Sequence, residues 1–235
     1  MLRSPLARRA LAEFVGSAFL VLAVVGSGIA AQRMSPGDVG LQLLENALAT
    51  VFALTALLLA FGPVSGAHFN PAVSCVEAAA GRLPRSHVAP YVAAQLAGTA
   101  LGAVLANALY GRPVFEWATT DRNATRLVLS EAVATFGLLL VIRGVSSSPT
   151  PRATPFAVAA FVGGAYWFTS STAFANPAVT LARTLSDSFA GISPASVPGF
   201  LVGQTAGAFT GALIGRALFP SPAAPTPSDA PGAAP

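Results

Sequence analysis

The tripeptide Asn-Pro-Ala occurs twice in this chain, at residues 70–72 and 176–178. Asn at a helix start can accept hydrogen bonds from the first backbone amides, and Pro at the next position sacrifices no hydrogen bond. Two such helix starts facing each other would direct two positive helix ends at one point, where a cation is disfavoured. A water molecule or neutral polyol would instead meet two amide donors. The pair predicts a pore midplane formed by Asn70, Pro71, Ala72, Asn176, Pro177 and Ala178.

The composition indicates a membrane protein. The chain is 54% hydrophobic and 9% charged, whereas about a quarter of the residues in a soluble domain are charged. All 13 basic residues are Arg and they are scattered, so we expect no nucleic-acid partner. Cys75 is the single cysteine, and there are only two histidines. We therefore expect no disulfide within the chain and no metal site built on Cys or His. A passive pore would also need no cofactor and no catalytic centre.

Apolar stretches of about 20 residues are long enough to cross a bilayer. The candidates are residues 10–31, 41–61, 88–109, 127–145, 155–170 and 197–219. The first could alternatively be a signal peptide, but its apolar run is longer than a usual signal core. The runs 70–80 and 176–185 are too short to span a bilayer and suit half-helices. The pattern predicts an all-α membrane protein with six transmembrane helices and two re-entrant half-helices.

The two halves of the chain resemble each other. Leu11-Ala12-Glu13 is echoed by Leu129-Ser130-Glu131. Tyr91, Gln95, Gly98 and Gly102 share their spacing with Phe200, Gln204, Gly207 and Gly211. Three spans per half is an odd number, so the second half must run opposite to the first. Such an inverted repeat places the functional site near the membrane midplane, and its small-xxx-small patterns favour close helix packing.

The repeat defines one domain, and the loop charges orient it. Residues 1–219 form the predicted domain, with halves at about 10–110 and 127–219, while the Pro/Ala/Ser-rich tail 220–235 is predicted to be disordered. More Arg residues fall on the side of the chain termini than on the other side. The positive-inside rule therefore places both termini in the cytoplasm. The Arg-only, Ala/Gly/Pro-rich composition favours a bacterial inner membrane.

The segment from Ser65 to Val73, Ser-Gly-Ala-His-Phe-Asn-Pro-Ala-Val, resembles the first signature of the aquaporin (major intrinsic protein) family. The resemblance covers residues ~10–219 and implies a homotetramer with one pore per subunit. It also implies that Glu13 and Glu131 brace the re-entrant loops. The backbone carbonyls that it implies as pore acceptors belong to Gly66, Ala67, His68, Thr172, Ala173, Phe174 and Ala175.

The chain departs from the family at the second signature. The family usually continues Asn-Pro-Ala with Arg, which lines the narrowest point, but this chain has Val179. Counting without gaps places the other filter positions at Thr50, Gly164 and Ala173. Thr, Gly, Ala and Val predict a wide constriction without fixed charge, open to solutes larger than water.

Arg183 permits two interpretations. Asn176, Val179 and Arg183 share one helix face, and helical side chains lean toward the N-terminus. Arg183 can therefore reach back toward Val179 and stand at the extracytoplasmic mouth, attracting anions and repelling cations. The alternative is an Arg that snorkels to the interface and pairs with Asp187, four residues further on.

The sequence predicts a passive channel for small uncharged solutes. The stretch from Phe174 to Arg183 resembles a bacterial subgroup associated with arsenic resistance, which implies arsenous acid and related neutral metalloid hydroxides alongside glycerol-like polyols and water. A water-selective aquaporin is the first alternative. A coupled secondary transporter is a second, since inverted repeats with broken helices occur there too, and a non-conducting structural protein is a third.

Overall fold

The computed structural model describes residues 5–219, which contain eight α-helices. These are α1 (Leu6–Met34), α2 (Val39–Ser65), α3 (Pro71–Ala79), α4 (Arg85–Leu109), α5 (Thr125–Ser146), α6 (Thr154–Phe168), α7 (Pro177–Ala182) and α8 (Val197–Leu218). Short 3-10 helices precede α6 (η1, Pro151–Ala153), follow α7 (η2, Arg183–Leu185) and precede α8 (η3, Pro194–Ser196). The predicted disorder of residues 220–235 lies outside the described residues.

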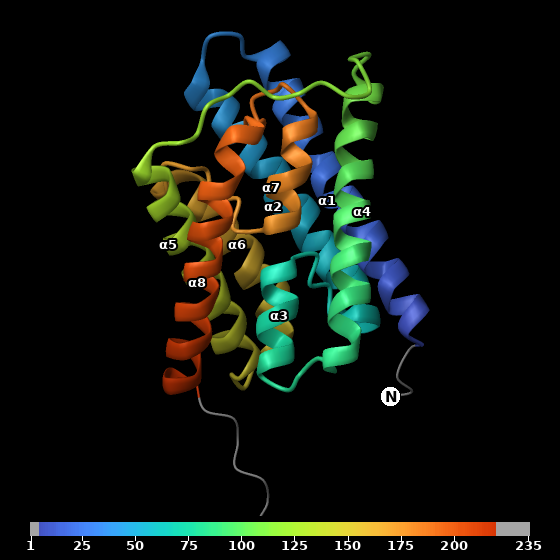
Figure 1. Ribbon diagram of the computed structural model, residues 1–235, viewed down its shortest axis with the longest axis vertical. Helices are drawn as coiled ribbons and strands as arrows, with labels where there is room; N and C mark the ends of the chain where they lie inside the picture. The colour runs from blue at the N-terminus through green and yellow to red at the C-terminus, as the bar shows by residue number, and fades with distance from the viewer. Residues whose placement is uncertain (1–4, 220–235) are drawn as a thin grey trace, which may run out of the picture.

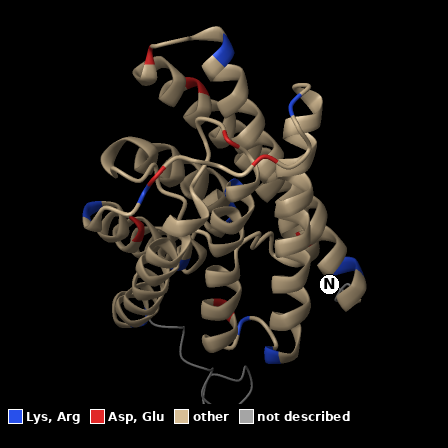
Figure 2. Cartoon of the chain, turned by 45° about the horizontal axis from the view of Figure 1, so that its top comes forward, with Lys and Arg blue, Asp and Glu red and all other residues tan. Residues whose placement is uncertain are grey.

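The predicted six-span fold class is confirmed, with one unusually short span. Helices α1, α2, α4, α5 and α8 are long and apolar enough to cross a membrane. Helix α6 has 15 residues, so it is only about 22 Å long. It packs against α2 and α5 and is the fifth of the six spans in chain order. Charged residues lie mostly in loops and near helix ends, as Figure 2 shows.

The inverted repeat is visible as two groups of three helices. Helix α1 packs against α2 and α4, and α5 packs against α6 and α8. The groups meet where α2 contacts α6, and the half-helices α7 and α3 lie one above the other between them (Figure 1). The start of α1 and the end of α8 lie at the same end of the bundle (Figure 1).

Glycines allow the central helices of each half to approach closely. A Cβ atom added at Gly98 of α4 would lie 2.2 Å from the Phe14 carbonyl oxygen of α1, and one added at Gly207 of α8 would lie 2.3 Å from the Ala132 carbonyl oxygen of α5. Neither space admits a side chain. The small-xxx-small patterns therefore form the α1–α4 and α5–α8 contacts, as membrane helices commonly do.

Candidate functional site

The two Asn-Pro-Ala asparagines cap their own half-helices and hold the opposite loop. The Asn70 Oδ1 atom accepts a hydrogen bond from the Ala72 amide at 2.9 Å, and Asn176 Oδ1 accepts one from Ala178 at 3.0 Å. Asn70 Nδ2 donates to the Ala175 carbonyl at 2.8 Å, and Asn176 Nδ2 donates to the Phe69 carbonyl at 2.8 Å. An amide nitrogen carries two hydrogens, so each keeps a second donor beside the cavity.

The loops before the half-helices contain unusual backbone conformations. Positive φ angles occur at Ala67 and Phe69 in one loop and at Ala173 and Ala175 in the other, all between 46° and 48°. Thr172, at 63°, extends the series. Non-glycine residues adopt this region infrequently, and it persists where surrounding contacts enforce it.

Two buried carboxylates supply those contacts. Glu13 of α1 accepts hydrogen bonds from the His68 amide at 3.0 Å and the Phe69 amide at 2.6 Å. Glu131 of α5 accepts them from the Phe174 amide at 2.9 Å and the Ala175 amide at 2.8 Å. Both side chains are fully buried. These are the positions that the bracing role of Glu13 and Glu131 requires.

The repeated glutamines complete each brace, a role that was not predicted from the sequence. Gln95 of α4 donates to Glu13 at 2.8 Å and to the Ser74 hydroxyl at 2.9 Å. Gln204 of α8 donates to Glu131 at 2.6 Å and to the Thr180 hydroxyl at 2.7 Å. The sequence does contain a feature that indicates this role, since the two glutamines occupy equivalent positions in the two halves. A polar side chain that is repeated in an apolar helix and buried there needs a hydrogen-bond partner.

A cavity of about 590 Å³ runs beside both half-helices. Its lining includes these predicted site residues: Thr50, Gly66, Ala67, His68, Asn70, Ala173, Phe174, Ala175, Asn176, Val179 and Arg183. The predicted midplane residues Pro71, Ala72, Pro177 and Ala178 form the first turns of the half-helices and are not part of the lining. Thr172 is also outside it.

The predicted filter position on α6 was wrong. Gly164 is exposed and does not line the cavity. Tyr166, two residues further along, is 3% exposed, lines the cavity, and its hydroxyl lies 3.1 Å from the Thr50 hydroxyl. The prediction of Gly164 came from counting residues without gaps, which fails if α6 is displaced by a few residues relative to the family pattern. A shift of two residues moves a position to the other face of a helix.

Arg183 joins three of the predicted filter residues, Thr50, Ala173 and Val179, in the lining of the cavity. Arg183 is 2% exposed and lines the cavity. Its Nε atom donates to the Ala190 carbonyl, and its guanidinium carbon lies 3.4 Å from the centre of the Phe174 ring. The alternative pairing with Asp187 is wrong, because the Asp187 carboxylate accepts from the Thr119 amide at 2.9 Å and the Thr119 hydroxyl at 3.0 Å.

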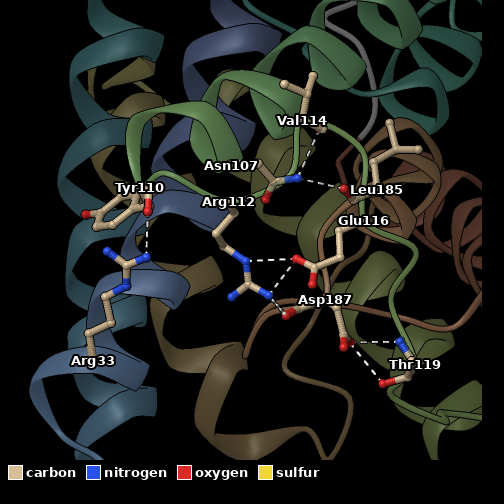
Figure 3. A network of polar contacts seen from close by, with 9 residues as sticks. All are labelled: Arg33, Asn107, Tyr110, Arg112, Val114, Glu116, Thr119, Leu185 and Asp187. Atoms are coloured by element: carbon tan, nitrogen blue, oxygen red, sulfur yellow. Dashed lines mark hydrogen bonds and ion pairs between the residues drawn. The ribbon is translucent and has the colours of Figure 1, made fainter.

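The segment between α4 and α5 holds the outer loop that follows α7. Arg112 forms an ion pair with Glu116 at 2.6 Å and donates to the Asp187 carbonyl at 2.5 Å, as Figure 3 shows. Asn107 donates to the Leu185 carbonyl at 2.9 Å (Figure 3). We call these contacts the outer strap, because they lie at the end of the bundle opposite the start of α1 (Figure 1). They fix the backbone two and four residues after Arg183.

Arg122 also lies in the segment between α4 and α5, but its role differs from that of Arg183. Its guanidinium group donates to the carbonyls of Gly191 at 3.0 Å, Ser171 at 3.3 Å and Phe189 at 3.5 Å. It does not line the cavity. Burial lowers the pKa of Arg122. Arg122 therefore ties the outer loops together rather than facing a solute.

The fold and the site define a pore-type membrane protein in which two opposed half-helices meet beside a cavity. The chain belongs to the major intrinsic protein family, whose sequence profile matches residues 1–153. Proteins of this family are channels rather than enzymes.

Individual relatives agree with this assignment. The chain is 43% identical over 221 residues to the aquaglyceroporin AqpS of Rhizobium meliloti strain 1021, covering 94% of this chain and 93% of that protein. It is 31% identical to the probable aquaporin AqpM of Archaeoglobus fulgidus, covering 87% and 95%. The crystal structure of the Plasmodium falciparum aquaglyceroporin superposes with a TM-score of 0.64 at 21% identity, over 90% of this chain and 95% of that one, and supports the fold.

Proposed function

We propose that the protein is a passive transmembrane channel for water, glycerol-like polyols and neutral metalloid hydroxides such as arsenous acid. The observation that carries the proposal is the pair of asparagine amides that line one cavity, each fixed by a hydrogen bond to the opposite loop. Fixed donors can replace the hydrogen bonds that a neutral solute loses on leaving water. Two helix N-termini beside them disfavour cations.

The lining of the cavity supports solutes larger than water. Leu54, Leu138 and Val158 provide apolar wall, which suits the carbon side of a polyol. The loop carbonyls of Gly66 and Ala175 can accept from its hydroxyls, as the family resemblance implies. The name aquaglyceroporin of the 43% identical relative points to the same solute class. Arsenous acid presents comparable hydroxyl groups without charge.

The experiment is stopped-flow permeability of proteoliposomes to water, glycerol and arsenous acid, against protein-free liposomes. We expect all three solutes to cross faster in proteoliposomes. Val179→Arg introduces a second buried cation beside Arg183, and we expect it to reduce glycerol flux about tenfold. Val179→Leu is the matched control and should conduct. Flux of water alone would replace the proposal by a water-selective channel, and saturable, proton-dependent uptake would replace it by a coupled transporter.

We also propose a homotetramer in a bacterial inner membrane with both termini cytoplasmic. The family resemblance supports the tetramer, and the Arg bias of the loops supports the orientation. Light scattering of the detergent-solubilised protein measures the number of subunits. Labelling of single cysteines, placed at Arg126 or at Arg152 in a Cys75→Ser background, measures which side of the membrane each loop faces. We expect a label added outside to reach position 126 and not position 152. A monomer, or label reaching Arg152 from outside, would contradict these proposals.

A further inference from the structure

Arg183 is a buried cation whose hydrogen-bonding capacity is mostly unused within the protein. A guanidinium group has five N–H donors. The Nε donor is taken by the Ala190 carbonyl, and among residues 5–219 the structure gives Nη1 and Nη2 no hydrogen-bond acceptor. The ion pairs found in this part of the chain involve Arg82 and Arg112 instead. A charge that is 2% exposed and lacks a carboxylate partner is costly unless another group compensates it.

Two contacts fix where this group points. The Phe174 ring lies 3.4 Å from the guanidinium carbon, a cation–π arrangement. The Ala190 carbonyl holds Nε. Together they anchor one edge and one face of the guanidinium plane. Arg183 is also one of the residues that line the cavity.

The cavity wall beside Arg183 contains the other polar groups that a solute needs. Thr50 and Tyr166, which share a hydrogen bond of 3.1 Å, line the same cavity. A hydroxyl can donate or accept, so this pair can complement a cation that only donates. Val179 and Ala173 supply the apolar remainder of the wall.

We propose that Arg183 determines the specificity of the channel, its free Nη groups binding hydroxyl oxygens of a neutral polyhydroxyl solute while its charge repels cations. The inference rests on the proposed channel function and deepens it. Val179 occupies the position from which the family usually presents its Arg, and Arg183 reaches the cavity from one helical turn further along. The same charge thus enters the filter from a different backbone position.

The test compares three Arg variants in proteoliposomes, with proton and sodium leak measured separately from glycerol flux. For Arg183→Leu we expect proton and sodium leak to rise about tenfold or more, because the charge beside the cavity is lost. For Arg183→Lys we expect leak to stay low, since the charge remains, while glycerol flux falls several-fold, because Lys lacks the planar donor fork. Arg126→Leu is the control, because it removes a charge from an exposed position in the first turn of α5. We expect it to change neither the leak nor the glycerol flux.

The outcomes separate the two proposals. Glycerol flux by the wild type with unchanged leak in Arg183→Leu would overturn the role of Arg183 and leave the channel function standing. A wild type that conducts no solute would overturn the channel function and the role of Arg183 with it. If Arg183→Leu fails to fold, Arg183→Lys decides alone, and unchanged glycerol flux in that variant would overturn solute binding by Arg183.

Discussion

The two halves of the molecule are nearly equivalent where they meet and different where they open. At the centre, Asn70 and Asn176 exchange hydrogen bonds of equal length with the opposite loops, at 2.8 Å each. The Glu13–Gln95 and Glu131–Gln204 pairs brace those loops in the same manner. Both loops need these partners for the same reason, because the polar groups of non-helical backbone inside a membrane must all be hydrogen-bonded.

At the two entrances the halves have different side chains. The loop of the first half presents His68, which lies 3.0 Å from the Ser74 hydroxyl and packs edge-on against Tyr91. The corresponding place in the second half holds Phe174, on which Arg183 is stacked. The comparison teaches that the repeat retains the contacts that support the two loops and varies the side chains with which those loops line the cavity.

The largest effect should follow from removing the carboxylate braces. Glu13→Gln and Glu131→Gln each replace an acceptor of charge-assisted bonds, so we expect each to lower the free energy of unfolding by about 3 kcal/mol and to abolish solute flux. Glu13 also accepts from the Ser65 hydroxyl at 2.6 Å, so its loss should cost more. Thermal denaturation in detergent and stopped-flow flux measure both effects.

Glu45→Gln is the control for these variants, since Glu45 accepts from the Ser35 hydroxyl at a loop and does not brace the pore. Equal stability of Glu13→Gln and the wild type would show that the buried carboxylate does not brace the first re-entrant loop.

The next effect tests whether helix packing is equivalent in the two halves. Gly98→Ala and Gly207→Ala place a methyl group against a backbone carbonyl of the neighbouring helix, and we expect each to cost about 2 kcal/mol. Gly164→Ala is the matched control, because its nearest neighbour lies 3.8 Å from the added Cβ atom. A difference of more than about 1 kcal/mol between the first two, measured by thermal denaturation, would show that packing is unequal.

A smaller effect sharpens the placement of the filter. Tyr166→Phe removes the hydroxyl that pairs with Thr50, and an unpaired buried hydroxyl costs about 1 kcal/mol. We expect the ratio of glycerol to water permeability to change two- to threefold, since one solute contact is lost. Gly164→Ala should leave that ratio unchanged. The reverse pattern in stopped-flow flux would restore Gly164 as the filter position.

Much of this architecture was accessible from the sequence because it rests on local chemistry. The Asn-Pro-Ala caps, the spans and the glycine contacts follow from helix starts, apolar length and residue size. Tyr166 was not found, because its position depends on how α6 is offset against α2. The position of Arg183 was open, because sequence alone could not decide between a place at the pore mouth near Val179 and a pairing with Asp187.

The smallest effect concerns the outer strap. Arg112→Ala removes a partly exposed ion pair with Glu116, and such pairs contribute roughly 0–1 kcal/mol. Arg82→Ala removes the Glu77 pair at the opposite entrance, where that ion pair raises the pKa of Arg82. We expect faster hydrogen exchange near the outer loop in the first variant only, with unchanged melting temperatures in both. Global destabilisation by either would show that an entrance contributes to the stability of the whole fold.

The crossed asparagine bonds also constrain the order in which the protein can be completed during synthesis. Glu13 and Gln95 are both made within the first half, so the first loop can be braced as soon as α4 is in place. The Asn70 amide, however, donates to Ala175, and the Phe69 carbonyl waits for Asn176, each more than 100 residues later in the chain. Until the loop between α6 and α7 is in place, these two polar groups of the first re-entrant loop lack the partners that they have in the complete fold.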